Sequence, residues 1–469
     1  MWSVINDFLV NVDNFVWGVP LMVLIMAGGL LLTVRLGLLQ IRKLPLALKW
    51  MIQNEEEAEG EISSFAALCT ALSATIGTGN IVGVATAVCA GGPGALFWMV
   101  AAAFLGMATK YSEGLLAVKY RVVAPDGHSL GGPFYYIEQG MGKNWKWLAK
   151  IFAFFGVCVG LFGIGTFSQV NGIASAINGF FDPDNAHCVK ILPFLGEYSW
   201  SVVIASLILT VCVAAVLIGG VKRIASVSQI VVPFMAILYF AFAVILIICN
   251  ITEIPAAIKV IVTAAFTPKA VTGGAVGSMF VAMQKGVARG IFSNEAGLGS
   301  APIAAAAAQT KEPVRQGLVS MTGTFIDTIV ICTLTGLSIV LTGAWQVEGL
   351  EGVEVTTYAF QQGLPFPPAV SSFVLMLCLV FFAFTTILGW DYYSERCLEY
   401  LSGGNLKHVK VYRWIYIFAV FIGPYMTVSA VWTIADIFNG LMALPNMIAL
   451  FALSGVVVRE TKAFFKKQS

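Results

Sequence analysis

Two apolar segments of the sequence are interrupted by glycines that stand beside polar residues. The first interruption reads IGTGN at 76–80, and the second reads GIFSNEAGLGS at 290–300. They lie inside the apolar blocks 64–90 and 276–308. Glycine is about 1 kcal/mol less favourable than alanine inside a helix. We therefore expect both segments to break a helix near the middle of a membrane.

A helix that breaks at this depth frees backbone groups that no water can satisfy, so the break must line a cavity or be buried in protein. The half-helix that ends near Thr75 presents carbonyls and the negative end of its dipole, which suits a small cation. The half-helix that begins near Asn80 presents N–H groups, which suit a carboxylate. One break therefore predicts a cation site beside an anion site.

Glycines in membrane helices often serve only close helix packing, and the glycines of the fourth apolar block are interpreted in that way. Packing does not explain the polar residues gathered at the two breaks. These are Thr78, Asn80, Ser293, Asn294 and Glu295. Matched breaks in the two halves of a chain are typical of a transporter's binding site.

Further polar residues lie in two other apolar blocks. Ser168 and Gln169 fall in the fourth, whereas Thr385, Thr386 and the pair Trp390–Asp391 fall in the ninth. The two threonine hydroxyls could complete an oxygen cage for sodium. They could equally bond the carbonyls of their own preceding turn, as threonines in membrane helices often do. The sequence leaves both possibilities open.

Ionisable residues within apolar blocks are functional suspects. Lys110 and Glu113 are one helical turn apart, and we expect them to pair structurally. Asp327 and Asp436 are also expected to be structural, because neither lies near a break. Arg289 and Glu295 flank the second break and could pair as a gate. The three histidines fall in loops, so no histidine relay is expected.

The amino-acid composition is that of a membrane protein. The chain has 469 residues, of which 58% are hydrophobic and 11% charged, with a mean hydropathy of +0.86. Soluble domains carry about 25% charged residues. The apolar blocks exclude a barrel, whose strands alternate. A net charge of +2 suggests no nucleic-acid partner, and the nine cysteines form no CxxC pair. No positive segment precedes Arg35, so we expect no cleavable signal peptide.

Eleven transmembrane helices are predicted in this all-α, polytopic chain. They lie at 17–39, 64–90, 94–121, 147–180, 200–219, 227–249, 276–308, 317–342, 369–400, 411–431 and 433–458. The segment 255–266 is too short to cross. Lysines and arginines concentrate in alternate loops, and the opposite loops hold only Lys190, Lys259 and Lys269. This bias places the N-terminus outside and the C-terminus in the cytoplasm.

Without the first span, ten spans remain, and they divide into two sets of five. An odd number per set inverts the second relative to the first. The expected parts are an extra N-terminal helix and linker (1–62), a first repeat (63–250), an extracellular loop with a short interfacial helix (251–275), a second repeat (276–458) and a cytoplasmic tail (459–469).

Four segments carry a family resemblance. They are GVARGIFSNEAGLGSAPIAAAAAQT (286–310), CTALSATIGTGNIVGVATAVCAGGPGALFWM (69–99), GGPFYYIEQGMG (131–142) and ILGWDYYSERCLEYL (387–401). Together they resemble the alanine or glycine:cation symporter family. The resemblance implies a LeuT-type five-helix inverted repeat after one extra span. It also implies uptake of alanine or glycine with sodium across the cell membrane, without an organic cofactor.

The resemblance also implies which residues bind. Carbonyls of Ser73 and Ile76, with hydroxyls of Thr385 and Thr386, would hold sodium. The first break shows no second acidic residue, so a second sodium site is not supported. The implied substrate residues are Gly77, Thr78 and Gly79 for the carboxylate, and Asn80, Gln169, Phe292, Thr386 and Trp390 around the rest of the amino acid.

Other functions remain possible at this point. Proton coupling could run through Glu295 or Asp391. A channel would need a continuous polar lining, whereas the polar residues concentrate at mid-membrane. An enzyme would need a nucleophile with a base or a metal cluster, and no such motif is visible. The choice between alanine and glycine, the stoichiometry and the oligomeric state cannot be read from the sequence.

Overall fold

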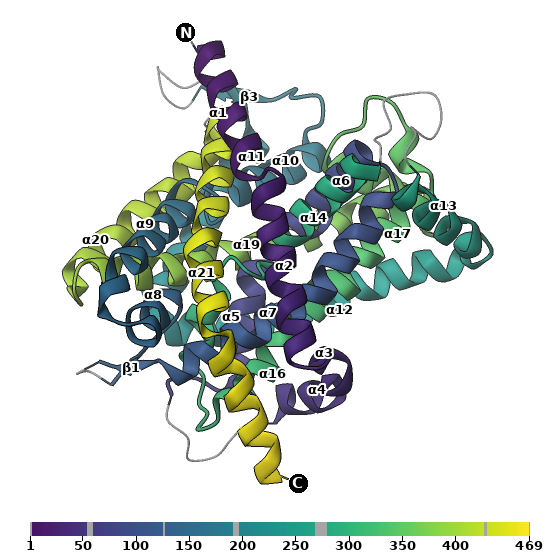
Figure 1. Ribbon diagram of the computed structural model, residues 1–469. Coiled ribbons are helices and arrows are strands. Elements are labelled where there is room, and N and C mark those ends of the chain that lie inside the picture. Colours follow the sequence, from purple (N-terminus) through teal and green to yellow (C-terminus); the bar gives the residue numbers. More distant parts are fainter. Residues whose placement is uncertain are drawn as a thin grey trace.

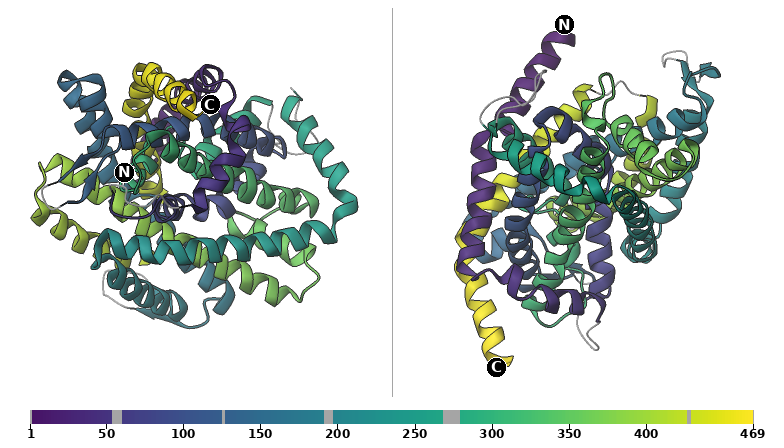
Figure 2. Two further views of the ribbon diagram at one scale, coloured as in Figure 1. Left: turned by 90° about the horizontal axis from the view of Figure 1, so that it is seen from below. Right: turned by 90° about the vertical axis from the view of Figure 1, so that its right-hand side faces the viewer.

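The computed structural model describes residues 2–53, 60–124, 127–190, 197–267, 279–425 and 429–468. Long helices pack into one bundle, and the two ends of the chain lie at opposite ends of it (Figure 1). The first and last helices run side by side along one flank (Figure 2, right). Termini at opposite ends fit an odd number of membrane crossings.

The helices account for most of the described chain. Their bounds are α1 (Trp2–Val16), α2 (Val19–Arg35), α3 (Leu39–Arg42), α4 (Leu44–Ile52), α5 (Ser64–Thr75), α6 (Val84–Gly91), α7 (Gly94–Lys119), α8 (Pro133–Tyr135), α9 (Lys146–Phe162), α10 (Phe167–Phe181), α11 (Trp200–Leu217), α12 (Gly220–Cys249), α13 (Ile254–Phe266), α14 (Met279–Asn294), α15 (Ala301–Ala305), α16 (Pro313–Thr324), α17 (Thr333–Leu341), α18 (Val353–Gly363), α19 (Pro368–Leu401), α20 (Leu406–Ile422) and α21 (Ser429–Gln468).

Several irregular turns join these helices. The π-helical turns are η1 (Gly79–Gly83), η2 (Tyr136–Met141) and η5 (Phe325–Cys332), and the 3-10 turns are η3 (Lys143–Trp145), η4 (Ile251–Glu253), η6 (Ala344–Gln346) and η7 (Gly423–Tyr425). Short π-helical turns inside α-helices occur often at functional sites. Here η1 belongs to the first break, and η5 faces it from the other half of the chain.

Two small antiparallel ladders are the strands of the described chain. β1 (Val122–Val123) pairs with β2 (Ser129–Leu130), and β3 (Cys188–Lys190) pairs with β4 (Glu197–Ser199). Both connect long helices and lie outside the predicted spans. The predicted all-α class therefore describes the membrane part, and the ladders are additions to the loops.

Eight helices of the described chain are long and apolar enough to cross a membrane, or nine if the two pieces of the first break count as one span. The predicted segment 276–308 contains a break, and 411–431 contains the end of α20 and η7, so neither forms one long helix in its described part. The protein is thus a polytopic helical membrane protein, and the count of eleven stays a prediction.

Helix α2 begins at Val19, close to the predicted start of the first span at residue 17, and the helical stretch long and apolar enough to cross runs from Asp7 to Arg35. The segment predicted to be too short to cross forms one 13-residue helix, α13.

Helix α7 packs extensively against both α14 and α16. Helix α19 meets α5 at Gly389, where a Cβ atom would lie 2.8 Å from the backbone nitrogen of Ala74. This glycine permits the close approach that brings the middle of α19 against the end of α5. These contacts position the polar groups described next.

Candidate functional site

The first break separates α5 from η1 and α6, with a bend of 54° between the two pieces. Side chains bind the backbone amides that the break frees. The amide of Gly77 donates to Oδ1 of Asn80 at 2.8 Å, and the amide of Thr78 donates to Oε1 of Gln169 at 3.2 Å. One side chain from the break itself and one from α10 therefore stabilise the break by accepting hydrogen bonds from its freed amides.

This arrangement leaves carbonyls at the end of α5 available. The amide of Gly77 would bond the carbonyl of Ser73 in a continuous helix, but it bonds the Asn80 side chain instead. The carbonyl of Ile76 faces the hydroxyl of Thr386, which donates to it at 3.2 Å. Oxygen atoms from α5 and α19 thus converge at the negative end of a helix dipole, an arrangement that favours a small cation.

The two neighbouring threonines of α19 face different partners. The hydroxyl of Thr386 reaches Ile76, whereas that of Thr385 donates to the carbonyl of Phe382 at 3.0 Å and lies 3.5 Å from the sulfur of Met235. Thr386 also bonds Phe382, at 2.9 Å. Both threonines therefore bond their own preceding turn, and only Thr386 also meets the first break.

The two glycines of the first break differ in the space around them. A Cβ atom at Gly77 would lie 2.6 Å from the hydroxyl oxygen of Thr386 and 3.2 Å from Oε1 of Gln169. A Cβ atom at Gly79 would meet the ring of Phe292 at 3.7 Å, an ordinary contact. Gly77 is therefore enclosed by the predicted site residues, and Gly79 faces Phe292 with room to spare.

The second break lies between α14 and α15 and uses left-handed backbone. Glu295, Gly297 and Gly299 have φ angles of 56°, 93° and 85°. Such angles are uncommon outside glycine. The carboxylate of Glu295 accepts a hydrogen bond of 2.5 Å from Ser300, which closes the turn.

Lys110 and Glu113, both in α7, bind the backbone of the second break. The prediction that they pair with each other is wrong. The ammonium of Lys110 donates to the carbonyl of Asn294 at 2.8 Å, at the negative end of α14. Oε1 of Glu113 accepts from the amide of Gly297 at 3.1 Å and from Asn446 at 2.6 Å. The two side chains therefore bind opposite sides of one turn.

Asp327 joins the two breaks, which corrects the expectation that it lies away from both. Its Oδ1 accepts from the Asn80 side chain at 2.7 Å, and its Oδ2 accepts from Ser293 at 2.9 Å. Thr328 also donates to Oδ2, at 2.7 Å. Asp327 lies in η5 and is fully buried. In the sequence, the sign of this role was a charged residue inside an apolar segment. The partners of Asp327 could not be predicted, because they are distant in sequence.

A cavity of about 80 Å³ lies beside Phe292. It is lined by both acidic and basic side chains from α1, α14 and α21: Asp13, Lys285, Arg289 and Asp436. The guanidinium of Arg289 lies 5.3 Å from the centre of the Phe292 ring. Arg289 and Glu295 do not pair as the expected gate, because Glu295 binds Ser300 instead. Asp436 lines the charged cavity.

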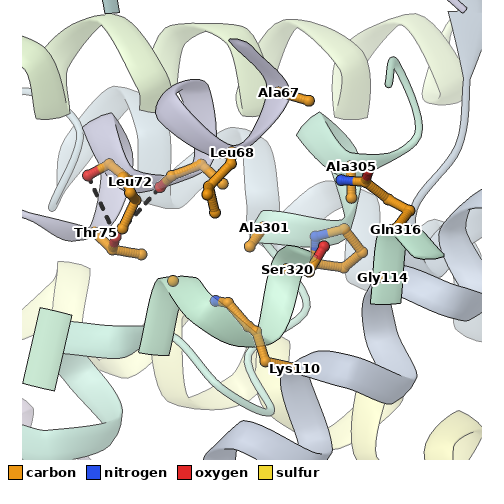
Figure 3. Close-up of a pocket in the computed structure, with 13 residues that line it drawn as sticks. Ala67, Leu68, Leu72, Thr75, Lys110, Gly114, Ala301, Ala305, Gln316 and Ser320 are labelled. Carbon is orange, nitrogen blue, oxygen red and sulfur yellow. Dashed lines mark hydrogen bonds between the residues drawn. The ribbon is translucent and has the colours of Figure 1, made fainter. Parts of the chain in front are cut away.

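A second cavity lies between α5, α7, α15 and α16 (Figure 3). Lys110 points into it, and Thr75 and Gln316 belong to its wall. Its interior volume is about 10 Å³, which is the space of about one water molecule. The bundle is thus closely packed on this side.

Two remaining candidates lie deeper in α19. Trp390 is fully buried, and its ring packs at 5.5 Å, edge on, against Tyr393. Asp391 is also fully buried, and within the described chain neither of its carboxylate oxygens has a hydrogen-bond partner. Trp390 lies one turn beyond Thr386 on α19.

Comparisons with known proteins identify the chain's relatives. A family model described as the sodium:alanine symporter family matches residues 2–469. An uncharacterized transporter of Haemophilus influenzae is 55% identical over 99% of this chain and 97% of its own length. The sodium/alanine symporter AgcS of Methanococcus maripaludis is 47% identical, covering 97% and 96%. A putative sodium/proton-dependent alanine carrier of Bacillus subtilis is 36% identical, covering 96% and 90%.

Proposed function

Because this chain belongs to the sodium:alanine symporter family, we propose that it carries alanine or glycine into the cell together with sodium. Membership makes it a transporter of the cation-coupled amino-acid type rather than an enzyme. The identity of the amino acid, the coupling ion and the residues that bind them are our proposal.

The observation that carries the proposal is the meeting of Ile76 and Thr386. The carbonyl at the end of α5 and the hydroxyl of α19 are 3.2 Å apart and fully buried or nearly so. Sodium takes oxygen ligands, and unwound carbonyls of broken helices provide them in transporters. We assign the cation to Ile76, Thr386 and the carbonyl of Ser73. We leave Thr385 out of this assignment, because its hydroxyl donates to the carbonyl of Phe382 and lies beside Met235.

The substrate carboxylate is assigned to the amide of Gly79. Of the three amides expected to bind it, those of Gly77 and Thr78 already bond side chains. The amide of Gly79 has no such partner in the described chain, and it lies beside the ring of Phe292. Since Oε1 of Gln169 is bonded to Thr78, its Nε2 atom is left for the substrate.

The space around this position supports a small substrate. Thr78 packs against Gly172 of α10, where a Cβ atom would lie 2.6 Å from Cγ2 of Thr78. Gly77 is enclosed on two sides, and the ring of Phe292 lies at ordinary contact distance from a Cβ position at Gly79. An amino acid with a hydrogen or a methyl side chain fits such a site best, and Trp390 would limit longer ones.

The two cavities suggest how the substrate enters and leaves. The charged cavity beside Phe292 would be the outer entrance, and the closely packed cavity beside Lys110 would open on the inner side. This scheme assumes the predicted N-out topology and the LeuT-like inverted repeats, whose first helices contain the two breaks. Asp327 links those helices, so the two halves would move together.

Proton coupling is the second candidate. It is favoured by Asp391, whose fully buried carboxyl group has no hydrogen-bond partner in the described chain. A buried, unpaired carboxylate is costly in a membrane. Protonation would remove that cost. Glu295 is a weaker candidate, because it already accepts from Ser300.

Uptake into vesicles distinguishes the two candidates. Purified full-length protein is reconstituted and supplied with radiolabelled alanine or glycine under a sodium gradient, and separately under a pH gradient in sodium-free buffer. We expect accumulation with sodium and little with the pH gradient alone. Equal accumulation under the pH gradient would overturn sodium coupling.

A further inference from the structure

A groove of about 460 Å³ with four basic side chains lies at the end of the molecule where the C-terminus lies. We call it the basic groove. Arg35 lines it from the end of α2, Arg42 and Lys43 line it from α3 and the residue after it, and Lys462 lines it from α21. None of the described residues that line it is acidic.

The chain builds this groove from two segments more than 400 residues apart. Helix α2 ends at Arg35, and Gly37 and Leu38, with φ angles of 62° and 55°, reverse the chain into α3. The reversal returns Arg42 toward the end of α2, where its guanidinium donates to the carbonyl of Leu36 at 3.3 Å. Helix α21 passes alongside and completes the opposite wall (Figure 2).

Within the part of the chain that the structure describes, three of the four cations of the groove contact uncharged partners. Arg35 donates to the hydroxyl of Ser454 at 2.6 Å, and the ammonium of Lys43 lies 4.2 Å from the ring centre of Phe465. Within the described chain, none of the four cations forms an ion pair with a carboxylate. Like charges held in one groove repel each other, so an anion between them lowers the energy.

The rest of the wall is apolar. It consists of Val34, Leu36, Leu39, Val458 and Phe465. Val34 and Ile41 beside it expose 68% and 56% of their surface. A ligand for this groove therefore combines an anionic group with hydrocarbon, at the depth where a spanning helix leaves the membrane.

We propose that the basic groove binds the headgroup of an anionic phospholipid, with the phosphate between the four cations and the acyl chains along α2 and α21. Basic pockets between membrane helices are suited to such headgroups. A free phosphate would use only the charges and would gain nothing from the apolar wall. The proposal is independent of what the protein transports.

Lipid binding to the purified full-length protein in neutral detergent tests this. Phosphatidylglycerol and phosphatidylcholine with identical acyl chains are titrated, and bound lipid is counted by native mass spectrometry. Inorganic phosphate is a third arm, read out as displacement of bound phosphatidylglycerol. We expect phosphatidylglycerol to bind at least tenfold more tightly than phosphatidylcholine, and millimolar phosphate to displace little of it.

The variant is Arg42→Gln/Lys462→Gln, and the matched control is Lys407→Gln/Lys410→Gln, which removes two exposed cations of α20 outside the groove. Each basic residue near an anionic surface strengthens binding about fivefold. The groove variant lacks two of them, so it should bind phosphatidylglycerol about 25-fold more weakly. The control should stay within twofold of the original protein. The melting temperature without lipid shows that both variants fold.

Three results would overturn the proposal: equal affinity for the two lipids, equal loss in groove variant and control, or full displacement by phosphate. Equal loss in both variants would mean that the basic residues act only through the general charge of that face. Failure of amino-acid uptake would leave the lipid result unaffected, so the two proposals fail separately.

Discussion

The side-chain amide of Asn80 donates to Oδ1 of Asp327 at 2.7 Å, across 247 positions of sequence. The other oxygen of the same carboxylate accepts from Ser293. One buried acidic side chain thereby connects the two broken helices, in which the sequence analysis places the binding site. Coupling between two halves requires such a physical link, and this one uses charge-assisted hydrogen bonds.

Replacing Asp327 should therefore damage transport more than its volume suggests. Asp327→Ala leaves buried donors of Asn80 and Ser293 without an acceptor, at a cost of about 3 kcal/mol. Asp327→Asn keeps one acceptor and should fold, with alanine uptake reduced at least tenfold. Uptake in vesicles and melting temperature are the two measurements. Normal uptake by Asp327→Asn would show that the charge does not couple the breaks.

The two threonines of α19 should differ in their effect on sodium. Thr386→Ala removes an oxygen that faces Ile76, so the sodium concentration for half-maximal uptake should rise about tenfold, equivalent to about 1.4 kcal/mol. Thr385→Ala is the matched control, because its hydroxyl lies beside Met235. Its sodium dependence should change less than threefold. Equal effects of the two variants would contradict the assignment of Thr386.

The two glycines of the first break should also differ. Gly77→Ala places a Cβ atom 2.6 Å from the Thr386 hydroxyl, and uptake should fall below about a tenth of normal. Gly79→Ala has ordinary contacts, so the protein should keep its stability within about 1 kcal/mol. Its KM for alanine should rise several-fold, since the new methyl group lies beside the proposed carboxylate position. Unchanged alanine affinity in folded Gly79→Ala would show that the substrate carboxylate does not bind this amide.

Lys110 and Glu113 should act as a coupled pair although they do not touch. Lys110→Met leaves the carbonyl of Asn294 without its donor and removes a buried positive charge, which should destabilise the protein by about 3 kcal/mol. Glu113→Gln in the same chain should recover part of that loss, because it removes a nearby buried negative charge. A double-mutant cycle on melting temperature measures the coupling. Strictly additive losses would exclude it.

Glu138 gives a pH-dependent contribution outside the spans. It accepts 2.5 Å from Tyr400 and pairs with Lys146 at 2.9 Å. Burial raises the pKa of Glu138, but the hydrogen bonds from Tyr400 and Lys146 and the nearby lysine charges outweigh it and hold the pKa below 4.5. A lowered pKa means stability that is present above pH 4.5 and lost as the pH falls through the folded value.

Glu138→Gln should accordingly lower the melting temperature at pH 7, and the difference from the original protein should shrink below about pH 4. Glu354→Gln, at the start of α18, serves as a control. A difference that stays constant from pH 7 to well below pH 4 would mean that the carboxylate charge contributes nothing.

The amino-acid sequence by itself determined the class of protein and the positions of the breaks. A chain with 11% charged residues cannot keep its apolar blocks in water. Glycines at 77 and 79, or at 297 and 299, cannot continue a helix at low cost. Both are local properties, which composition and spacing record directly.

The tertiary structure alone decided which polar groups meet. Adjacent threonines point about 100° apart on a helix, and only the packing of α19 on α5 shows that Thr386 faces Ile76. Lys110 and Glu113 are suitably spaced to pair, yet the freed backbone of the second break competes for both and binds them. Asp327 finds its partners in two distant segments, because a buried charge takes the donors that folding brings to it.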